Sequence, residues 1–392
     1  MPDQTRPFLV PYVVWHPKFA AGKDLANALL EHFRRKLYEN VAGGTGLSVM
    51  FRSEPAPGSS VPLAINLEDA YTTAIVVFVE SSLAADPDWV KYVQGLSAQT
   101  QAAGLKALLF PVAIDEKGLS IGLDEQALRW NLWTGTDEEL RQRLISKLTY
   151  EFCRMLRHYL EHIKRPDEEV DELERFLQRV QIFLSHSKHD DDGERIAKLI
   201  RDRLNADGNL ATFFDVLDIP AGLRFQQVLL KQVRQSAVVA IHTDSYSSRE
   251  WCRREIIEAK RWNVPLVVAN CITNQDERAF PYLGNVPIVR MDPQLANRID
   301  VIIARLLDEV LKDFLWRCRV QLVGTGDPAI VFVPRQPELV SLTALPSQTV
   351  APKPTIVYPD PPLSGEEQQL FADLAPQVQL KSMTEWLAGV DK

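Results

Sequence analysis

Short apolar runs alternate with segments of helical periodicity between about residue 8 and residue 320. The runs are strand-sized, whereas the segments between them repeat apolar residues at every third or fourth position. In the first half the pattern predicts strands at Phe8–Trp15, Leu47–Arg52, Thr73–Glu80 and Leu105–Ile114, and helices at Asp24–Tyr38, Trp89–Ala103 and Asp137–Ile163. Apolar strands separated by helices are typical of a parallel sheet that is covered on both faces.

The same order of elements then starts again. The second set comprises strands at Val180–Ser185, Ala211–Asp215, Ala237–Thr243 and Pro265–Cys271, and helices at Asp192–Asn205, Phe225–Ser236, Trp251–Trp262 and Leu295–Arg319. A strand ends at His16 in the first set and at His186 in the second, and an acidic residue precedes the helix-opening Trp89 and Trp251. Such self-similarity indicates a repeated unit. We therefore predict an α/β protein with two tandem flavodoxin-like parallel-sheet sandwiches; chance similarity between two generic α/β units is the alternative.

Composition shifts set the expected domain boundaries. We expect a first domain at residues 1–165, an acidic linker or helix at 166–178, a second domain at 179–320 and a tail at 321–392. The tail holds 10 of the 25 prolines, so we expect mostly an extended, Pro-rich connector. One strand at Ala329–Val333 and short helices at Gly365–Leu374 and Ser382–Ala388 are expected within it. The tail also reads as a lead-in to a sensor domain beyond Lys392.

Charge and cysteine content restrict the class of protein. A net charge of -8 and a pI of about 5.5 argue against general nucleic-acid binding. The four cysteines form no CxxC pair, which suits a reducing cytosol. The N-terminal residues show no signal-peptide pattern, and no apolar run approaches the roughly 20 residues that a membrane span needs. We expect a soluble, cytoplasmic protein without membrane or nucleic-acid partners.

Candidate chemistry gathers in the loops of the second unit. The first strand runs into the polar loop of the sequence QIFLSHSKHD, and the second is followed by FFDVLDIPAG. The third leads into HTDSYSSREWCRREI, which places Trp251 and Glu255 four residues apart on one face of a helix. Ligands of open α/β sheets bind beyond the carboxyl ends of the strands, so we expect a site at these loops.

These three segments resemble the Toll/interleukin-1 receptor (TIR) domain family over about residues 180–320. The strand Ile182–Ser187 is similar to the box-one strand, and Phe214–Gly222 is similar to the BB loop. Ser248, Trp251 and Glu255 match the family's SxxWxxxE segment. The order and spacing of the three elements make the combined signal specific. The resemblance implies a TIR-type fold for the second unit, and the first unit looks like a divergent relative.

Many prokaryotic TIR domains cleave NAD+ at the bond between nicotinamide and ribose, and the resemblance implies this activity here. It makes Glu255 the catalytic residue, whose carboxylate would stabilise an oxocarbenium-like ribose. Trp251 offers an aromatic face for stacking, and Lys188 offers charge for phosphate oxygens. NAD+ is then a substrate, with no metal or further cofactor. The implied NAD+-binding residues are Ser185, His186, Ser187, Lys188, Phe214, Asp215, Leu217, Asp218, Ser248 and Trp251.

Each of these residues also has an ordinary structural interpretation. Glu255 lies in a charged stretch and by itself would be a solvated helix residue, and Trp251 by itself would be a packing residue. His186 and His189 lack the carboxylate or cysteine set that would complete a metal site. Cys252 is interpreted as a helix residue near the site and not as a nucleophile.

The first unit serves as an internal control. Val93 stands four residues after Trp89, where the second unit has Glu255 after Trp251. The first unit therefore lacks the acid. We interpret it as a non-catalytic TIR-like domain with a role in packing, assembly or sensing.

The leading hypothesis is an NAD+ glycohydrolase, or an ADP-ribose cyclase, that self-associates through its TIR domains and acts in prokaryotic antiphage defence. The rival hypothesis is a non-enzymatic scaffold in which both units serve assembly. A third is a nucleotide-binding protein that does not cleave its ligand. Phosphoryl transfer by a P-loop protein is disfavoured because the sequence contains neither GxxxxGK[ST] nor GxGxxG.

Overall fold

The computed structural model describes most of the chain. The described residues are 6–38, 46–164, 180–206, 211–213, 225–276, 278, 280–292, 297–323, 326–343 and 353–389. The chain divides into two compact units. Unit 1 comprises Met1–Phe176 and Arg317–Val323, and unit 2 comprises Leu177–Trp316 and Gly324–Lys392.

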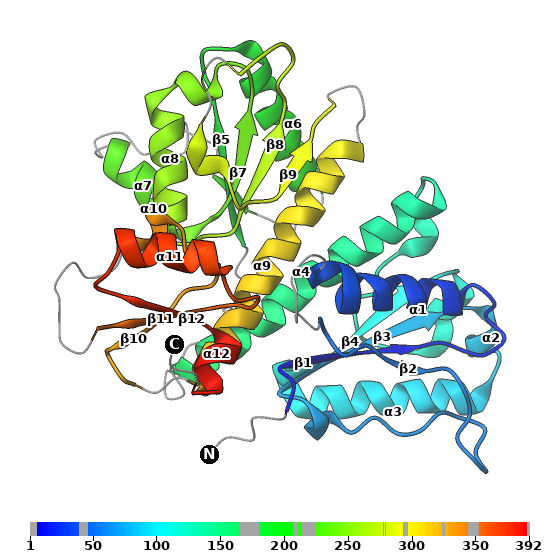
Figure 1. Cartoon of the computed structure of the whole chain (residues 1–392). Helices are drawn as coiled ribbons and strands as arrows, with labels where there is room; N and C mark the ends of the chain where they lie inside the picture. Colours follow the sequence, from blue (N-terminus) through cyan, green and yellow to red (C-terminus); the bar gives the residue numbers. More distant parts are fainter. Residues whose placement is uncertain are drawn as a thin grey trace. The chain divides into compact units, whose positions relative to one another are not determined.

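Unit 1 contains a four-stranded parallel sheet in the order β2-β1-β3-β4. The strands are β1 (Leu9–Val14), β2 (Met50–Arg52), β3 (Thr72–Val79) and β4 (Ala107–Ala113), and the helices are α1 (Gly22–Leu30), α2 (Ser81–Ala84), α3 (Pro87–Ala103) and α4 (Asp137–Lys164). Figure 1 shows α1 and α3 on opposite faces of the sheet, and all of β3 is buried between them. The strands and helices predicted for this half are confirmed, with ends shifted by up to three residues. The exception is the predicted helix Asp24–Tyr38, which is α-helical only to Leu30 and continues as a π-helical turn at Glu31–Arg35 and a 3-10 turn at Lys36–Tyr38.

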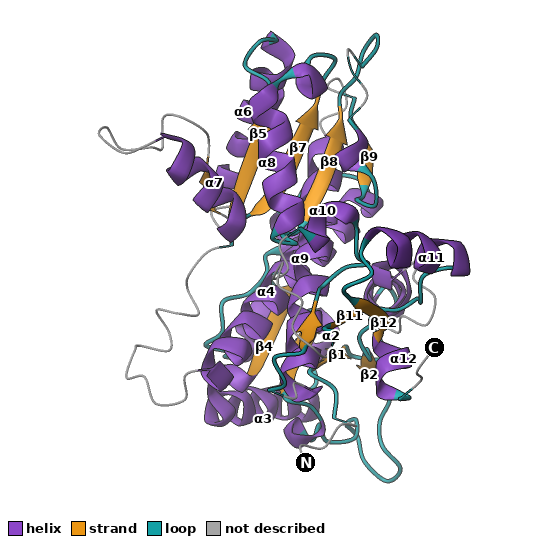
Figure 2. Ribbon diagram, turned by 60° about the vertical axis from the view of Figure 1, so that its left-hand side comes forward, coloured by secondary structure: helices purple, strands orange, loops and turns teal. Residues whose placement is uncertain are grey.

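Unit 2 contains a five-stranded parallel sheet in the order β6-β5-β7-β8-β9. The strands are β5 (Gln181–His186), β6 (Ala211–Phe213), β7 (Ala237–His242), β8 (Leu266–Asn270) and β9 (Ile288–Arg290), and the helices are α6 (Asp191–Ala206), α7 (Phe225–Gln235), α8 (Glu250–Arg261) and α9 (Asn297–Val323). Figure 2 shows β5, β7 and β8 side by side, with α8 against them. The edge strand β9 was not predicted.

The two sheets share the order of their first four strands, with the first strand between the second and the third. Both are wholly parallel, so all strands of one sheet end at the same edge. The predicted α/β class with parallel sheets is therefore confirmed. The predicted linker or helix at 166–178 lies outside the described residues.

The segment after α9 differs from the prediction of an extended connector, which is wrong for its described residues. A three-stranded parallel sheet, in the order β10-β11-β12, is built from β10 (Ile330–Phe332), β11 (Thr355–Tyr358) and β12 (Gln379–Ser382), with α10 (Leu339–Leu342), α11 (Gly365–Leu374) and α12 (Met383–Leu387). Ile356, Tyr358 and Phe371 contribute to its own small core. Pro334, Pro359 and other prolines here lie in loops between the strands, where a missing N–H interrupts no ladder. The strand and the two helices expected within the tail are present.

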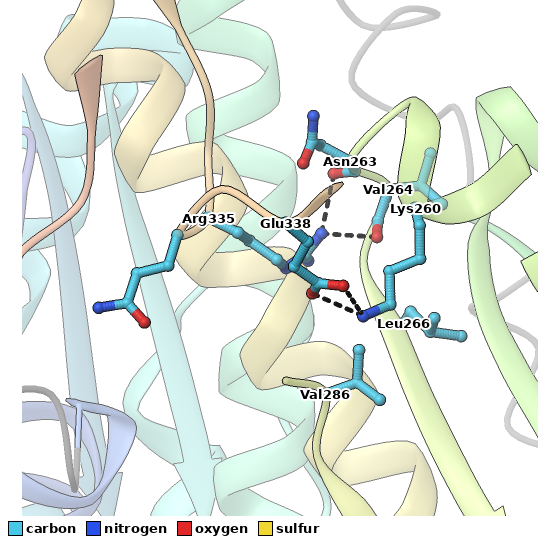
Figure 3. Close-up of a pocket in the computed structure, with 8 residues that line it drawn as sticks. Lys260, Asn263, Val264, Leu266, Val286, Arg335 and Glu338 are labelled. Carbon is cyan, nitrogen blue, oxygen red and sulfur yellow. Dashed lines mark hydrogen bonds and ion pairs between the residues drawn. The ribbon is translucent and has the colours of Figure 1, made fainter. Parts of the chain in front are cut away.

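The segment that follows β10 is attached to the end of α8 by a part-buried ion pair and by hydrogen bonds to backbone carbonyls (Figure 3). Lys260 Nζ lies 2.6 and 2.9 Å from the two carboxylate oxygens of Glu338, and it also donates to the carbonyl of Gly284. The Arg335 guanidinium donates to the carbonyls of Asn263 and Val264, at 2.9 and 2.6 Å. These two carbonyls belong to the turn that directly follows α8. The C-terminal segment thus hydrogen-bonds the connection between α8 and β8.

Within the described ranges, no helix combines the length and the apolar character that crossing a membrane requires.

Candidate functional site

A cavity of about 440 Å³ opens where β5 ends and α8 begins. It therefore lies at the carboxyl edge of the parallel sheet, where ligand sites of open α/β folds are found. Its lining comprises Phe183, Leu184, His186, Ser187, Lys188, His189, Ser248, Arg249, Glu250, Trp251, Cys252 and Glu255.

The cavity brings together six of the predicted site residues, which come from two separate segments of the sequence. They are His186, Ser187, Lys188, Ser248, Trp251 and Glu255. Ser185 is 1% exposed and lies behind Glu255 instead of in the lining. Phe214, Asp215, Leu217 and Asp218 lie outside the described residues.

The start of α8 determines how its side chains are presented. A 3-10 turn at Tyr246–Ser248 leads into the extended residue Arg249, after which the helix begins. The Arg253 guanidinium donates to the carbonyls of Ser247 and Ser248, at 3.0 and 2.8 Å, and so holds this turn against the helix. The apolar stripe of α8 packs into the core of unit 2. Its first two turns consequently face the cavity with both polar and aromatic side chains.

Glu255 is a nearly buried carboxylate, with 7% of its surface exposed. Its Oε2 accepts a hydrogen bond from the Ser185 hydroxyl at 2.5 Å. The same hydroxyl lies 2.6 Å from the phenol oxygen of Tyr246, which is fully buried. A buried carboxylate is costly to desolvate unless donors satisfy it, so this arrangement maintains an acid at the cavity wall.

Trp251 is 37% exposed and lies one turn before Glu255 on α8. The Arg254 guanidinium lies 4.5 Å from the centre of its ring. Such a cation–π contact holds the indole at the rim of the cavity and leaves aromatic surface accessible. The aromatic group and the acid predicted from the sequence thus meet in one cavity.

Cationic and imidazole side chains contribute to the same lining. Lys188 and His189 lie in the loop after β5, and Arg249 is the residue that directly precedes α8. Because these groups attract anionic oxygens, the cavity suits a ligand that carries phosphate. Burial raises the pKa of the Cys252 thiol, which makes it a poor nucleophile.

The loop after β5 is fixed by Asp190. This carboxylate accepts hydrogen bonds from the Gly193 amide at 2.6 Å, from the Thr243 hydroxyl at 2.7 Å and from the Ser245 hydroxyl. The Ser245 hydroxyl oxygen also lies 2.8 Å from the Ser187 hydroxyl oxygen, and because its one proton is given to Asp190 it accepts in this second contact. The cavity wall is therefore braced from the loop that follows β7, a role for Asp190 that the sequence analysis missed. Its signal in the sequence was an acidic residue in the loop four positions after the end of β5.

A second constellation, of Ser247, His242 and Asp276, superficially resembles a hydrolase triad. Ser247 Oγ and Asp276 Oδ2 lie 2.8 and 3.0 Å from the same nitrogen, His242 Nε2. In a nucleophilic triad the serine and the carboxylate occupy opposite nitrogens of the imidazole. Ser247 is also fully buried. These three residues fasten neighbouring loops and do not form a nucleophile.

The corresponding place in unit 1 is filled by packed side chains. Trp89 is 1% exposed, and its ring centroid lies 5.0 Å from that of His16. His16 Nε2 lies 3.5 Å from Asp86 Oδ2, and Val93 is fully buried. Trp89 is thus a core residue of unit 1, whereas Trp251 of unit 2 lies at the rim of the cavity.

Among the described residues, no group of three or more His, Cys, Asp or Glu side chains is arranged to hold a metal ion.

Comparison with known proteins identifies one family. Residues 182–297 match the family model for the TIR domain, so unit 2 carries a TIR domain. No curated protein matches the chain.

Two solved structures show weak similarity to the chain. The C-terminal domain of glucosamine-fructose-6-phosphate aminotransferase from Francisella tularensis shares 11% identity over 79% of this chain and 84% of that chain, with a TM-score of 0.19. A candidate phosphosugar isomerase from Silicibacter pomeroyi DSS-3 shares 12% identity over 81% and 88%, also with a TM-score of 0.19. Neither similarity bears on the fold or the site.

Proposed function

We propose that the TIR domain of unit 2 cleaves NAD+ between nicotinamide and ribose, with Glu255 as the catalytic residue. One observation carries the proposal: Glu255 is a nearly buried carboxylate in the wall of a cavity at the carboxyl edge of the sheet. The match to the TIR family supports it, because that family includes NAD+-cleaving members. The cavity volume of about 440 Å³ lies within the range of small-molecule sites.

The reaction requires mainly that the protein place a negative charge beside the ribose of NAD+. Nicotinamide departs from NAD+ as a neutral molecule with the electron pair of the glycosidic bond, and this leaves positive charge on the ribose. A carboxylate beside that ribose lowers the barrier by opposing the developing charge. Water then adds to the ribose carbon and loses a proton to the solvent to give ADP-ribose, or an adenine nitrogen adds to the same carbon to give a cyclic product. Glu255 performs the electrostatic step in either case.

The remaining lining residues are assigned to binding. Lys188 and Arg249 supply positive charge for the pyrophosphate, and Trp251 supplies an aromatic surface for a base. Residues of the BB-like loop, which are Phe214, Asp215, Leu217 and Asp218, are assigned to the substrate by the family resemblance. We propose that these residues contact the substrate in this cavity. The loop that carries them belongs either to the same molecule or to a neighbouring one, since TIR domains commonly self-associate.

Unit 1 is proposed to be a divergent, non-catalytic TIR-like copy. The shared order of the first four strands supports this, as do the buried Trp89 and Val93 at the place of the unit 2 cavity. Its role would be assembly or sensing, in an effector of antiphage defence that becomes active when it assembles.

The direct test is incubation of the purified full chain with NAD+, at low and high protein concentration, with chromatographic detection of nicotinamide. We expect nicotinamide to appear together with ADP-ribose or its cyclic form. Calorimetric binding of NAD+ without nicotinamide release would instead support a nucleotide-binding role. Neither binding nor release at any protein concentration would support the scaffold.

Replacing Trp251 with alanine is expected to raise the KM for NAD+ by about tenfold with a smaller change in kcat, because stacking acts on the bound substrate. Trp262→Ala is the matched control, because Trp262 is also partly exposed, at 50%, and directly follows the C-terminal end of the same helix. Steady-state rates of nicotinamide release measure both variants. Equal KM values for the two would remove Trp251 from the binding site.

A further inference from the structure

Ser185 is an unusual residue for its place in the fold. It lies near the end of β5, an interior strand of the sheet, after the buried apolar residues Ile182, Phe183 and Leu184. Its side chain is 1% exposed and is absent from the lining of the cavity. A hydroxyl in such surroundings must be satisfied by protein groups. Its two partners, Glu255 and Tyr246, come from two other elements of unit 2.

The direction of these hydrogen bonds follows from proton counting. A serine hydroxyl has one proton to donate and lone pairs to accept. Its 2.5 Å contact with Glu255 Oε2 uses the proton, because an ionised carboxylate can only accept. The 2.6 Å contact with Tyr246 must then be donated by the phenol. The three side chains therefore form a hydrogen-bond chain, in which Tyr246 donates to Ser185 and Ser185 donates to Glu255.

Tyr246 is suited to the first place in this chain. Burial raises its pKa well above the ordinary value, and the nearby Cys252 and Glu255 raise it further. The phenol therefore keeps its proton throughout the working pH range. Its ring belongs to the same buried core cluster as Phe183 and Ile256, which restricts where the hydroxyl points.

We propose that Ser185 and Tyr246 are positioning residues for Glu255, and that together they hold its carboxylate ionised and aimed at the cavity. This inference rests on the proposed function of Glu255. Hydrogen bonds donated to a carboxylate favour its charged form, and a bond between two hydroxyl groups strengthens the next one along the chain. Ser185 thus acts from behind the acid and does not touch the substrate.

Unit 1 offers an internal comparison. Pairing His16 with His186, and Trp89 with Trp251, places Trp15, Ala84 and Val93 where unit 2 has Ser185, Tyr246 and Glu255. Unit 1 thus has neither the carboxylate nor the two hydroxyl groups at these positions. Their joint absence agrees with a single purpose for the three.

The kinetic test uses Ser185→Ala, Tyr246→Phe and the double variant. We expect Ser185→Ala to lower kcat by about 10- to 100-fold with little change in KM, and Tyr246→Phe to lower it by about threefold to tenfold. In the Ser185→Ala background, Tyr246→Phe is expected to change kcat by less than about twofold, because its effect passes through Ser185. Two independent packing defects would give additive losses instead. Tyr358→Phe, at a fully buried tyrosine of the C-terminal sheet, is the control for loss of a buried hydroxyl.

A second measurement does not depend on catalysis. The carboxyl pKa of Glu255 can be followed by ¹³C NMR of glutamate-labelled protein, with the signal assigned from Glu255→Gln. Removal of the Ser185 donor is expected to raise this pKa by about one unit, and Tyr358→Phe is expected to leave it unchanged. The other titrating groups of the lining, Lys188, His186, His189, Arg249, Glu250 and Cys252, are the same in all the proteins compared.

The outcomes separate the two proposals. A wild-type protein that releases no nicotinamide, together with a raised Glu255 pKa in Ser185→Ala, would reject the proposed function but support the positioning role of Ser185 and Tyr246. If the wild-type protein is active and its folded Ser185→Ala and Tyr246→Phe variants keep the same kcat, the positioning role of Ser185 and Tyr246 would be overturned. An unchanged Glu255 pKa in Ser185→Ala would overturn it as well, with or without activity.

Discussion

Replacing Glu255 with glutamine is expected to slow nicotinamide release by at least about a thousandfold, which corresponds to roughly 4 kcal/mol of transition-state stabilisation. The amide has nearly the shape of the carboxylate and can still accept the hydrogen bond from Ser185. It lacks only the negative charge that opposes the charge developing on the ribose. Affinity for NAD+, measured by calorimetry, should change by less than about threefold, because the cationic and aromatic lining is intact.

Glu258→Gln is the matched control for this prediction. Glu258 lies on the same helix and is equally buried, with 4% exposure. Its carboxylate contacts Arg234 and the Trp262 indole, and none of these three residues lines the cavity. We expect this variant to lose stability and to keep its turnover. A Glu255→Gln variant that is folded, binds NAD+ and still releases nicotinamide at the wild-type rate would reject the catalytic assignment.

The parts of the fold that the sequence predicted are those with long apolar runs. The strands β3 and β7 are almost entirely buried, so their hydrophobic pattern is continuous and easily recognised. The edge strand β9 has three residues, and Ile288 in it is 59% exposed. A run that short and that exposed has no periodicity to detect. The C-terminal strands β11 and β12 are also short and were obscured by the surrounding prolines, whereas β10 was predicted.

The candidate site shows the same division between local and long-range information. Trp251 and Glu255 lie on one helical turn, so their spacing alone places them on one face. The loop after β5 reaches them because parallel strands share a carboxyl edge. The role of Ser185 could not be predicted in this way. Its partners Tyr246 and Glu255 are 61 and 70 residues away, and the sequence shows only a polar residue in an apolar strand.

The substitution Glu338→Gln is expected to lower the free energy of unfolding of unit 2 by about 3 kcal/mol, because it leaves the Lys260 ammonium buried without its counter-charge. The Lys260 side chain is 7% exposed, and that of Glu338 is 21% exposed. For a unit of this size the loss corresponds to a fall in melting temperature of about 6–12 °C. Glu366→Gln, at an exposed residue of α11, is the control and should change stability by less than about 0.5 kcal/mol. A Lys260→Met, Glu338→Met double variant should recover most of the loss, since it buries no charge.

The pH dependence of this loss tests its electrostatic origin. Burial lowers the pKa of Lys260, and Glu338 partly opposes that shift. Without the carboxylate, the pKa of Lys260 in the folded state falls further below that of the unfolded chain. Between these two values the unfolded chain binds more protons, so stability rises with pH. The deficit of Glu338→Gln relative to wild type should therefore be largest near neutral pH and shrink as the pH approaches the ordinary lysine pKa. A deficit that stays constant between about pH 7 and pH 10 would show that lost packing, and not the unpaired ammonium, destabilises the variant.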